Sequence, residues 1–193
     1  MIGNIAAGLY GIPTTPVTNS FESIATITVG AGGQSSIDFT SIPSTYKHLQ
    51  IRGIGRNASA TTGLNILKYR FNADSGSNYT SHSLYGTGAA ASATNTTGSS
   101  FGWFSRTSLI SNNSTTNVFG GFIIEILDYA STSKNRTTRT LAGVDINGTG
   151  AVELTSSVWL NSTTAINQIT LYDEASANFT QYSSFALYGI KDS

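Results

Sequence analysis

Short segments in which apolar and polar residues alternate recur from Phe21 to Ile190, and clusters of Gly, Ser, Asn and Asp separate them. In one of them, Leu49 and Ile51 face away from their polar neighbours. Alternation of this kind places successive side chains on opposite faces of a strand, and helical spacing is sustained nowhere. We therefore expect eight to ten strands in an all-β sandwich or barrel. The segments are residues 24–29, 36–39, 46–56, 64–71, 81–85, 101–110, 118–129, 137–146, 151–160, 165–172 and 184–190.

The segment at residues 118–129 is the most apolar of these. Its run of Ile residues favours a strand over a buried helical turn. Because the run alternates poorly, we expect both of its faces to be covered, the second one by the flank of the opposing sheet or by a neighbouring subunit. Two stretches are small and polar: residues 86–100 predict a long loop, and residues 111–117 predict a tighter turn.

The first 20 residues predict an extended arm, because Pro13 and Pro16 oppose helix and the flanking Thr residues favour extended backbone. Such an arm could reach about 65 Å. It lacks the basic start of a signal peptide. Its apolar residues either fold back on the domain or dock on another chain, and we favour docking on another chain: Ile2, Ile5, Leu9, Tyr10 and Ile12. The chain thus divides into an attachment arm at residues 1–20 and a β-sandwich domain at residues 21–193.

Charge is scarce: only 10% of the 193 residues are charged, and the formal net charge is zero. Ser, Thr, Asn and Gly take the place of the missing charges. A protein that binds nucleic acid through phosphates should be basic, so we do not expect that partner. Near-zero charge removes repulsion between copies and favours self-association. No segment is apolar for long enough to span a membrane, and the absence of Cys excludes disulfides and thiolate metal sites.

Four segments resemble small structural proteins encoded among the virion genes of tailed phages. They are FESIAT at residues 21–26, IPSTYKHLQIR at 42–52, RFNADSGSNY at 70–79 and FALYGI at 185–190. The resemblance covers Phe21 to the C-terminus, and the group has no agreed enzymatic motif. It implies a virion component built as a trimeric or otherwise symmetric β-sandwich, without deciding between tail and head.

No catalytic constellation stands out. His48 and His82 are the only histidines, and the serines that flank His82 should point to the opposite face of its strand. Among the carboxylates, we expect Glu125 to pair with a base or face solvent, and Asp173 with Glu174 to mark a turn. A glycosidase pair among these carboxylates stays open. We expect no enzyme activity and no cofactor.

Residues 74–78 have the spacing of a weak calcium loop, but the bidentate Glu of such loops is missing. The alternative is a β-turn in which Asp74 and Asn78 bond their own backbone, and we favour it. Calcium binding near Asp74 stays open.

Four residues are candidates for ligand contact: Trp103, Lys134, Arg136 and Arg139. Trp103 lies beside the long polar stretch and could stack on a sugar ring, whereas Trp159 lies in an alternating segment and should be core. The three basic residues could meet an anionic glycan or an acidic subunit, or simply lie in a solvated hairpin loop.

Taken together, these observations predict a jelly-roll-like antiparallel β-sandwich with an extended N-terminal arm, assembled as a homotrimer. We expect a structural protein of the phage virion, a tail-fibre or receptor-binding component held through its arm. The alternative is a capsid decoration protein, and a carbohydrate-active enzyme or free lectin ranks below it. Expected partners are other copies, other virion proteins and a host surface glycan, with no nucleic acid and no membrane.

Overall fold

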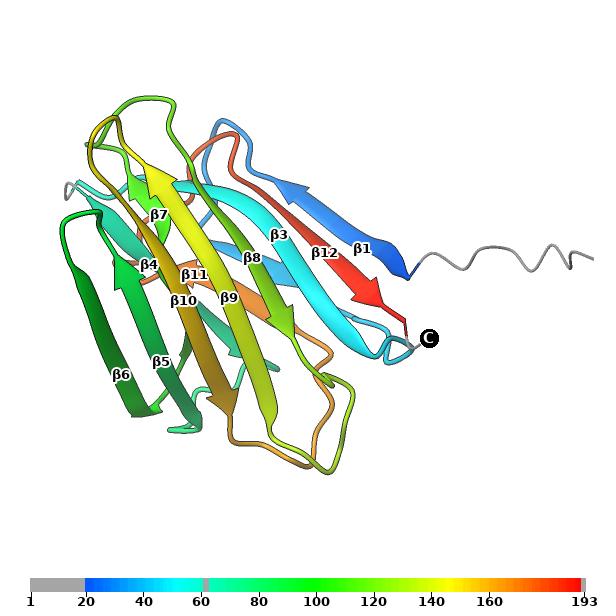
Figure 1. Ribbon diagram of the computed structural model, residues 1–193. Helices are drawn as coiled ribbons and strands as arrows, with labels where there is room; N and C mark the ends of the chain where they lie inside the picture. Colours follow the sequence, from blue (N-terminus) through cyan, green and yellow to red (C-terminus); the bar gives the residue numbers. More distant parts are fainter. Residues whose placement is uncertain (1–19, 61–62, 192–193) are drawn as a thin grey trace, which may run out of the picture.

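The computed structural model describes residues 20–60 and 63–191, and the regular structure of these residues is entirely β-strand (Figure 1). The all-β prediction is therefore confirmed. No helix in the described part of the chain is long and apolar enough to cross a membrane. The strands are β1 Phe21–Thr28, β2 Ser36–Phe39, β3 His48–Asn57, β4 Leu64–Phe71, β5 Tyr79–Gly86, β6 Ala91–Ser99, β7 Gly102–Ser111, β8 Gly120–Ile126, β9 Arg136–Asp145, β10 Gly150–Trp159, β11 Ile169–Asp173 and β12 Ser184–Ile190.

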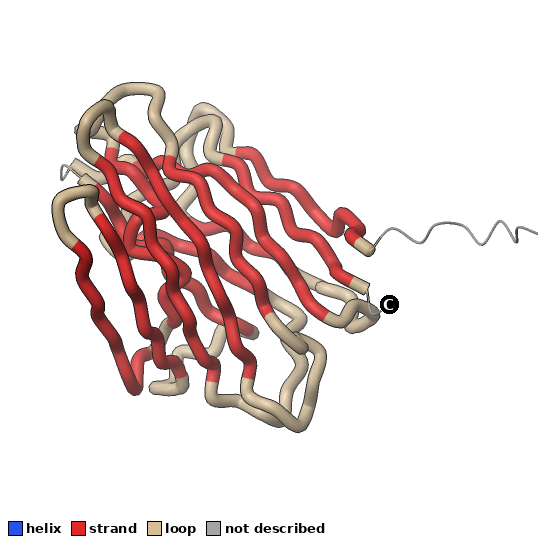
Figure 2. The backbone as a smooth tube through the Cα atoms, in the orientation of Figure 1, coloured by secondary structure: helices blue, strands red, loops and turns tan. Residues whose placement is uncertain are grey.

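The strands pair into one large mixed sheet with two parts (Figure 2). The eight-stranded part has the antiparallel order β1-β12-β3-β8-β9-β10-β5-β6, and the four-stranded part has the antiparallel order β2-β11-β4-β7. A short parallel pairing at the ends of β3 and β7 joins them, where Arg56 lies opposite Ile110 and Asn57 opposite Ser111. In Figure 1 the four-stranded part lies behind the eight-stranded part.

The core lies where β7 packs against β8, β9 and β10. Alternate residues of each strand point into it, as the period of two requires. Tyr69 of β4 stacks on Phe104 of β7 with 3.9 Å between ring centres, and Phe71 meets the buried Trp159 edge-on at 5.6 Å. Gly102 allows this packing, because a Cβ at that position would lie 2.1 Å from the Tyr69 ring. Burying each such ring contributes about 1.5–3 kcal/mol.

A second part of the interior is polar. On β5, β9 and β10 the residues that point inward are mostly Ser and Thr, and Glu153 lies among them with 1% exposure. The Glu153 carboxyl group accepts hydrogen bonds from the hydroxyls of Ser83, Ser105 and Thr155 and from the backbone N–H of Arg106. Hydrogen bonding of this kind offsets the cost of burying polar groups.

The structure corrects two expectations about individual segments. Residues 86–100 are not a long loop, because strand β6 pairs with β5 from Tyr79↔Ser99 to Gly86↔Ala91. The described residues also hold twelve strands, two more than the upper limit expected.

The most apolar segment forms strand β8, as its Ile residues indicated. Only one of its faces is covered within the chain, since Ile124 is fully buried and Ile123 is 40% exposed. The arm residues Ile2, Ile5, Leu9, Tyr10 and Ile12 lie outside the described residues.

Candidate functional site

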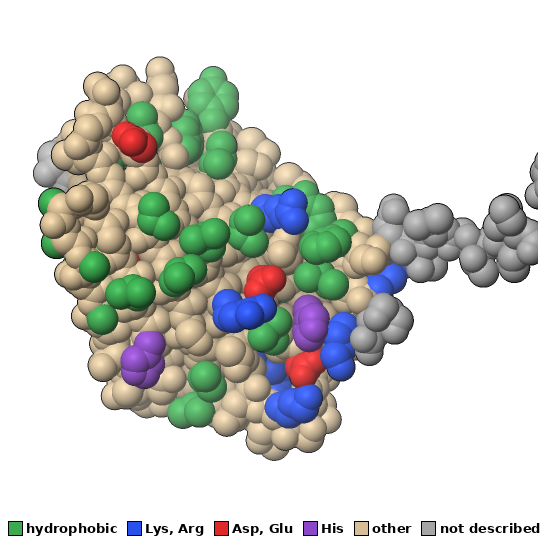
Figure 3. Space-filling model, in the orientation of Figure 1, with side chains coloured by type: hydrophobic (Ala, Val, Ile, Leu, Met, Phe, Trp, Pro, Cys, Tyr) green, Lys and Arg blue, Asp and Glu red, His purple; other side chains and the backbone are tan. Residues whose placement is uncertain are grey.

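The most unusual surface of the molecule is the outer face of the eight-stranded part, which points away from the core. Four exposed aliphatic side chains lie directly opposite one another there, on neighbouring strands from β8 to β5. We name this row the ridge: Ile123, Leu141, Leu154 and Leu84, with exposures of 40%, 50%, 57% and 54%. Figure 3 shows hydrophobic side chains as a band across this face. A contiguous exposed apolar patch marks an interaction surface in many soluble proteins.

A row of small residues runs beside the ridge, two positions further along each strand. We name it the trough: Gly121, Gly143, Val152, Gly86 and Ala91, which are paired across strands in that order. Shallow hollows lie along it; one is lined by Gly121 and Gly143 with Ile123, Leu141 and Val152. Ile54 of β3, 45% exposed, closes the row at one end.

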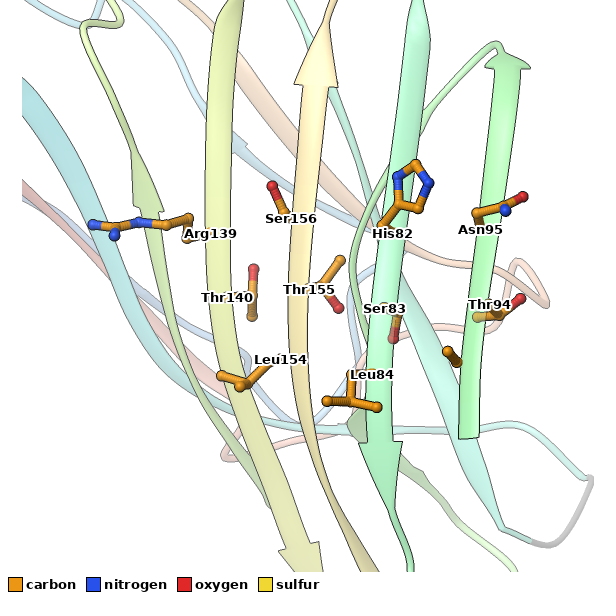
Figure 4. A pocket seen from close by; sticks show the side chains of 11 residues that line it. His82, Ser83, Leu84, Thr94, Asn95, Arg139, Thr140, Leu154, Thr155 and Ser156 are labelled. Atoms are coloured by element: carbon orange, nitrogen blue, oxygen red, sulfur yellow. The ribbon is translucent and has the colours of Figure 1, made fainter. Parts of the chain in front are cut away.

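On the other side of the ridge lies a polar row, in which Glu125, Arg139, Ser156, His82 and Asn95 succeed one another across the strands. Arg139 Nη2 lies 2.6 Å from Glu125 Oε2, so this carboxylate pairs with a base as expected. Figure 4 shows His82, Asn95, Ser156 and Arg139 around the shallow pocket on this part of the face.

This face does not arrange His82 for catalysis. Its cross-strand neighbours are Ser156 and Asn95, and Ser81 and Ser83 point inward as predicted. The nearest carboxylate in the row, Glu125, is three strands away and bound to Arg139. Within residues 20–60 and 63–191, no three His, Cys, Asp or Glu side chains come together as a metal site. The face is suited to apolar contact.

The polarity of β5, β9 and β10 is inverted relative to an ordinary half-buried strand. On β10, Val152 and Leu154 point outward, while Glu153, Thr155 and Ser157 point inward and are at most 5% exposed. On β9, Leu141 is exposed between the buried Thr140 and Ala142. Sequence reasoning missed these aliphatic residues as a site, because alternation alone does not say which face is covered. The signal available was the Glu and Thr content of an otherwise apolar strand.

The structure does not bring the four predicted ligand contacts together. Trp103 is half-buried, with the guanidinium of Arg106 5.7 Å from its ring centre. Lys134, with 62% of its side chain exposed, lies 2.7 Å from Asp128, and Arg139 lies in the polar row. The loop between β8 and β9 is therefore solvated at Lys134 but is an ion-paired corner rather than an open basic patch.

Arg136 requires a correction, because it is fully buried and inaccessible to a ligand. Its guanidinium donates hydrogen bonds to four main-chain carbonyls from two separate loops: those of Tyr129, Ser131, Asn161 and Thr164. The planar fork of an Arg suits this role. Arg136 fastens the loop after β8 to the loop after β10.

Asp128 is the charge centre of that corner. Lys134 and Lys47 lie 2.7 Å and 3.4 Å from its carboxylate, and its backbone N–H donates to Nδ1 of His48 at 2.9 Å. The hydrogen bond from Lys134 is the main cause that holds the pKa of Asp128 below its usual value. The group is mostly solvated, so its contribution to stability is small.

The carboxylates of Asp74 and Asp173 are both used internally. Asp74 accepts hydrogen bonds from the backbone N–H of Gly76 and the side chains of Asn78 and Trp159, which is the predicted turn. Burial raises its pKa, but these hydrogen bonds outweigh burial and lower it. Asp173 ends β11 at a turn, as expected, where burial raises its pKa. The structure also confirms Trp159 as a core residue, with 1% exposure.

No protein-family model, curated protein or solved structure matches the chain.

Proposed function

We propose that the chain is a structural protein of a phage virion, a tail-fibre or receptor-binding component attached through its N-terminal arm. The observation that carries the proposal is the inverted polarity of β5, β9 and β10, with aliphatic side chains outside and hydroxyls inside. A strand that works alone in water gains most by burying its aliphatic side chains. A chain with the opposite arrangement gains by covering its outer face in an assembly.

The strand order supports a jelly-roll-like sandwich as the building module. A jelly roll of eight strands pairs them in the orders 1-8-3-6 and 2-7-4-5, a fold common in capsid proteins and lectins. The orders β1-β12-β3-β8 and β2-β11-β4-β7 fit this scheme once β5–β6 and β9–β10 are counted as inserted hairpins. Both hairpins extend the eight-stranded part, and they carry three of the four ridge residues.

The place of β1 supports an attachment arm at residues 1–20. Strand β1 is the outermost strand of the eight-stranded part and is bonded only to β12. The residues before Phe21 therefore join the domain at a sheet margin rather than through its core. We propose that the apolar arm residues bind other virion proteins, and that the domain associates with copies of itself and meets a host surface glycan.

Immunogold electron microscopy of purified particles of the phage that encodes this chain tests the proposal. Gold on the tail supports the first choice, and gold over the head supports the alternative, a capsid decoration protein. Particles that carry no label, with the chain found only in the soluble lysate, would overturn the virion assignment. Release of sugars from host polysaccharide by the purified chain would favour a carbohydrate-active enzyme instead.

A further inference from the structure

We infer that the outer face of the eight-stranded part packs against the same face of a second copy, with the ridge of each copy seated in the trough of the other. The inference rests on the proposed function only in that it needs an assembled protein. It names the surface and the partner of that assembly.

The glycines of the trough are the first argument. A Cβ added at Gly121 would meet nothing within 4 Å, and one added at Gly86 would meet only the Ala90 carbonyl oxygen, at 3.9 Å. Neither residue has a positive φ. Glycine weakens a strand interior, and it often marks a place where another backbone or a ligand approaches closely. Packing within the chain does not account for these glycines, whereas the close approach of a second molecule does.

The second argument is that the face is complementary to itself. Ridge and trough are parallel rows, two residues or about 7 Å apart along the strands. A two-fold axis in the plane of contact, midway between the rows, exchanges them. Each bulky side chain then lies over a small residue of the second copy: Leu141 over Gly143, Ile123 over Gly121 and Leu84 over Gly86. Leu154 lies over Val152, and this arrangement is the isologous contact of a two-fold pair.

Charge follows the same symmetry. Arg139 lies one row beyond the ridge on β9, and the exposed Asp145 lies one row beyond the trough on the same strand. The axis that exchanges ridge and trough brings Arg139 of one copy over Asp145 of the other. The zero net charge of the chain adds no overall repulsion between copies.

The area of the face is sufficient. Six strands, from β3 to β6, carry the two rows. With neighbouring strands about 4.8 Å apart and a rise of about 3.3 Å per residue, they present a face of about 25 Å by about 30 Å. A standard protein interface buries about 800 Å² per partner, which this face can supply. Sheets that pack face to face cross at about −30°, so the pairing should be best near the axis at β9 and β10.

Light scattering after size-exclusion chromatography of the full chain tests the inference. The wild type is expected at twice the chain mass or an even multiple, with Leu141→Asp and Gly121→Val shifted to the monomer and unchanged in melting temperature. Two matched controls should associate as the wild type does. Leu160→Asp changes a residue of similar exposure off this face, 48% against 50%, and Gly32→Val fills another site with open space.

Cross-linking identifies the occupant directly, because the chain contains no Cys. A mixture of Leu154→Cys and Val152→Cys proteins should be joined by a short thiol-reactive linker, and the same mixture with Leu160→Cys in place of Leu154→Cys should not. A monomeric wild type, a trimer that Gly121→Val leaves intact, or a linker that joins this face to the arm would each overturn the inference. None of these results changes where gold labels the particle, so the proposed function is judged separately.

Discussion

Glu153 on β10 accepts a hydrogen bond from the hydroxyl of Ser105 on β7, with 3.0 Å between Oε2 and Oγ. The bond crosses the interior between the two parts of the sheet. Ser83, Thr155 and the Arg106 backbone supply the other donors to the same carboxyl group. An interior built in this way is held together by acceptor geometry as well as by apolar packing.

Glu153→Gln should destabilise the fold by about 1–3 kcal/mol, because its NH₂ group would face a donor in place of an acceptor. Glu153→Ala should cost about 3 kcal/mol or more, since it also leaves a cavity and several orphaned hydroxyls. Urea unfolding measures both values. Glu174→Ala, which removes a half-exposed partner of Lys68, should cost about 1 kcal/mol or less. Equal losses in all three variants would contradict the buried network.

Arg136→Met should destabilise the domain by about 3 kcal/mol or more, because four loop carbonyls lose their donors in a buried place. Arg136→Lys should recover only part of the loss, since an ammonium group cannot reproduce the fork. Arg139→Met, with 61% of the native side chain exposed, should change the stability of the monomer by about 1 kcal/mol or less. An Arg136→Met variant as stable as the wild type would refute the fastening role.

Replacing Asp173 should alter how stability depends on pH. Burial raises its pKa in the folded chain, so its favourable contribution is complete below the unfolded value of about 3.9 and is lost as pH rises through the folded pKa. Asp173→Asn removes this titration. The stability of the variant relative to wild type should therefore increase as pH rises from about 4, measured by urea unfolding at several pH values. A difference that does not vary with pH would show that Asp173 titrates normally.

Calcium should not stabilise the chain. Both Asp74 oxygens are occupied, Oδ1 by the Gly76 N–H at 2.8 Å and Oδ2 by Trp159 Nε1 at 2.7 Å. Melting curves in calcium chloride and in EDTA should coincide. Asp74→Ala should cost about 3 kcal/mol through the lost turn and indole bonds. A calcium-dependent rise in melting temperature that Asp74→Ala abolishes would assign the turn to calcium binding.

Several elements were accessible from local pattern. Residues 64–71 and 184–190 form β4 and β12 with the predicted bounds, because each alternates clearly. The Asp74 turn followed from its own side-chain chemistry. Strand β6 was not accessible, since Ala91–Ser99 has no large apolar residue, and it is a strand because β5 supplies its backbone partners.

The position of Arg136 was equally hidden. Its neighbours Lys134 and Arg139 are exposed, and nothing local distinguishes the three basic residues. Arg136 is buried because the loops at residues 129–131 and 161–164 converge on it from different parts of the chain.

The chain's own pattern established that this is a β-rich protein with little charge and no thiols, because side-chain period and composition are local properties. Which face of each strand is covered was decided only in three dimensions. Residues that alternate as Val152, Glu153, Leu154 and Thr155 do are compatible with either orientation, and the usual assumption would bury Leu154. Pairing across β9, β10 and β5, with β7 packed on one side, placed Glu153 inside and the aliphatic ridge outside.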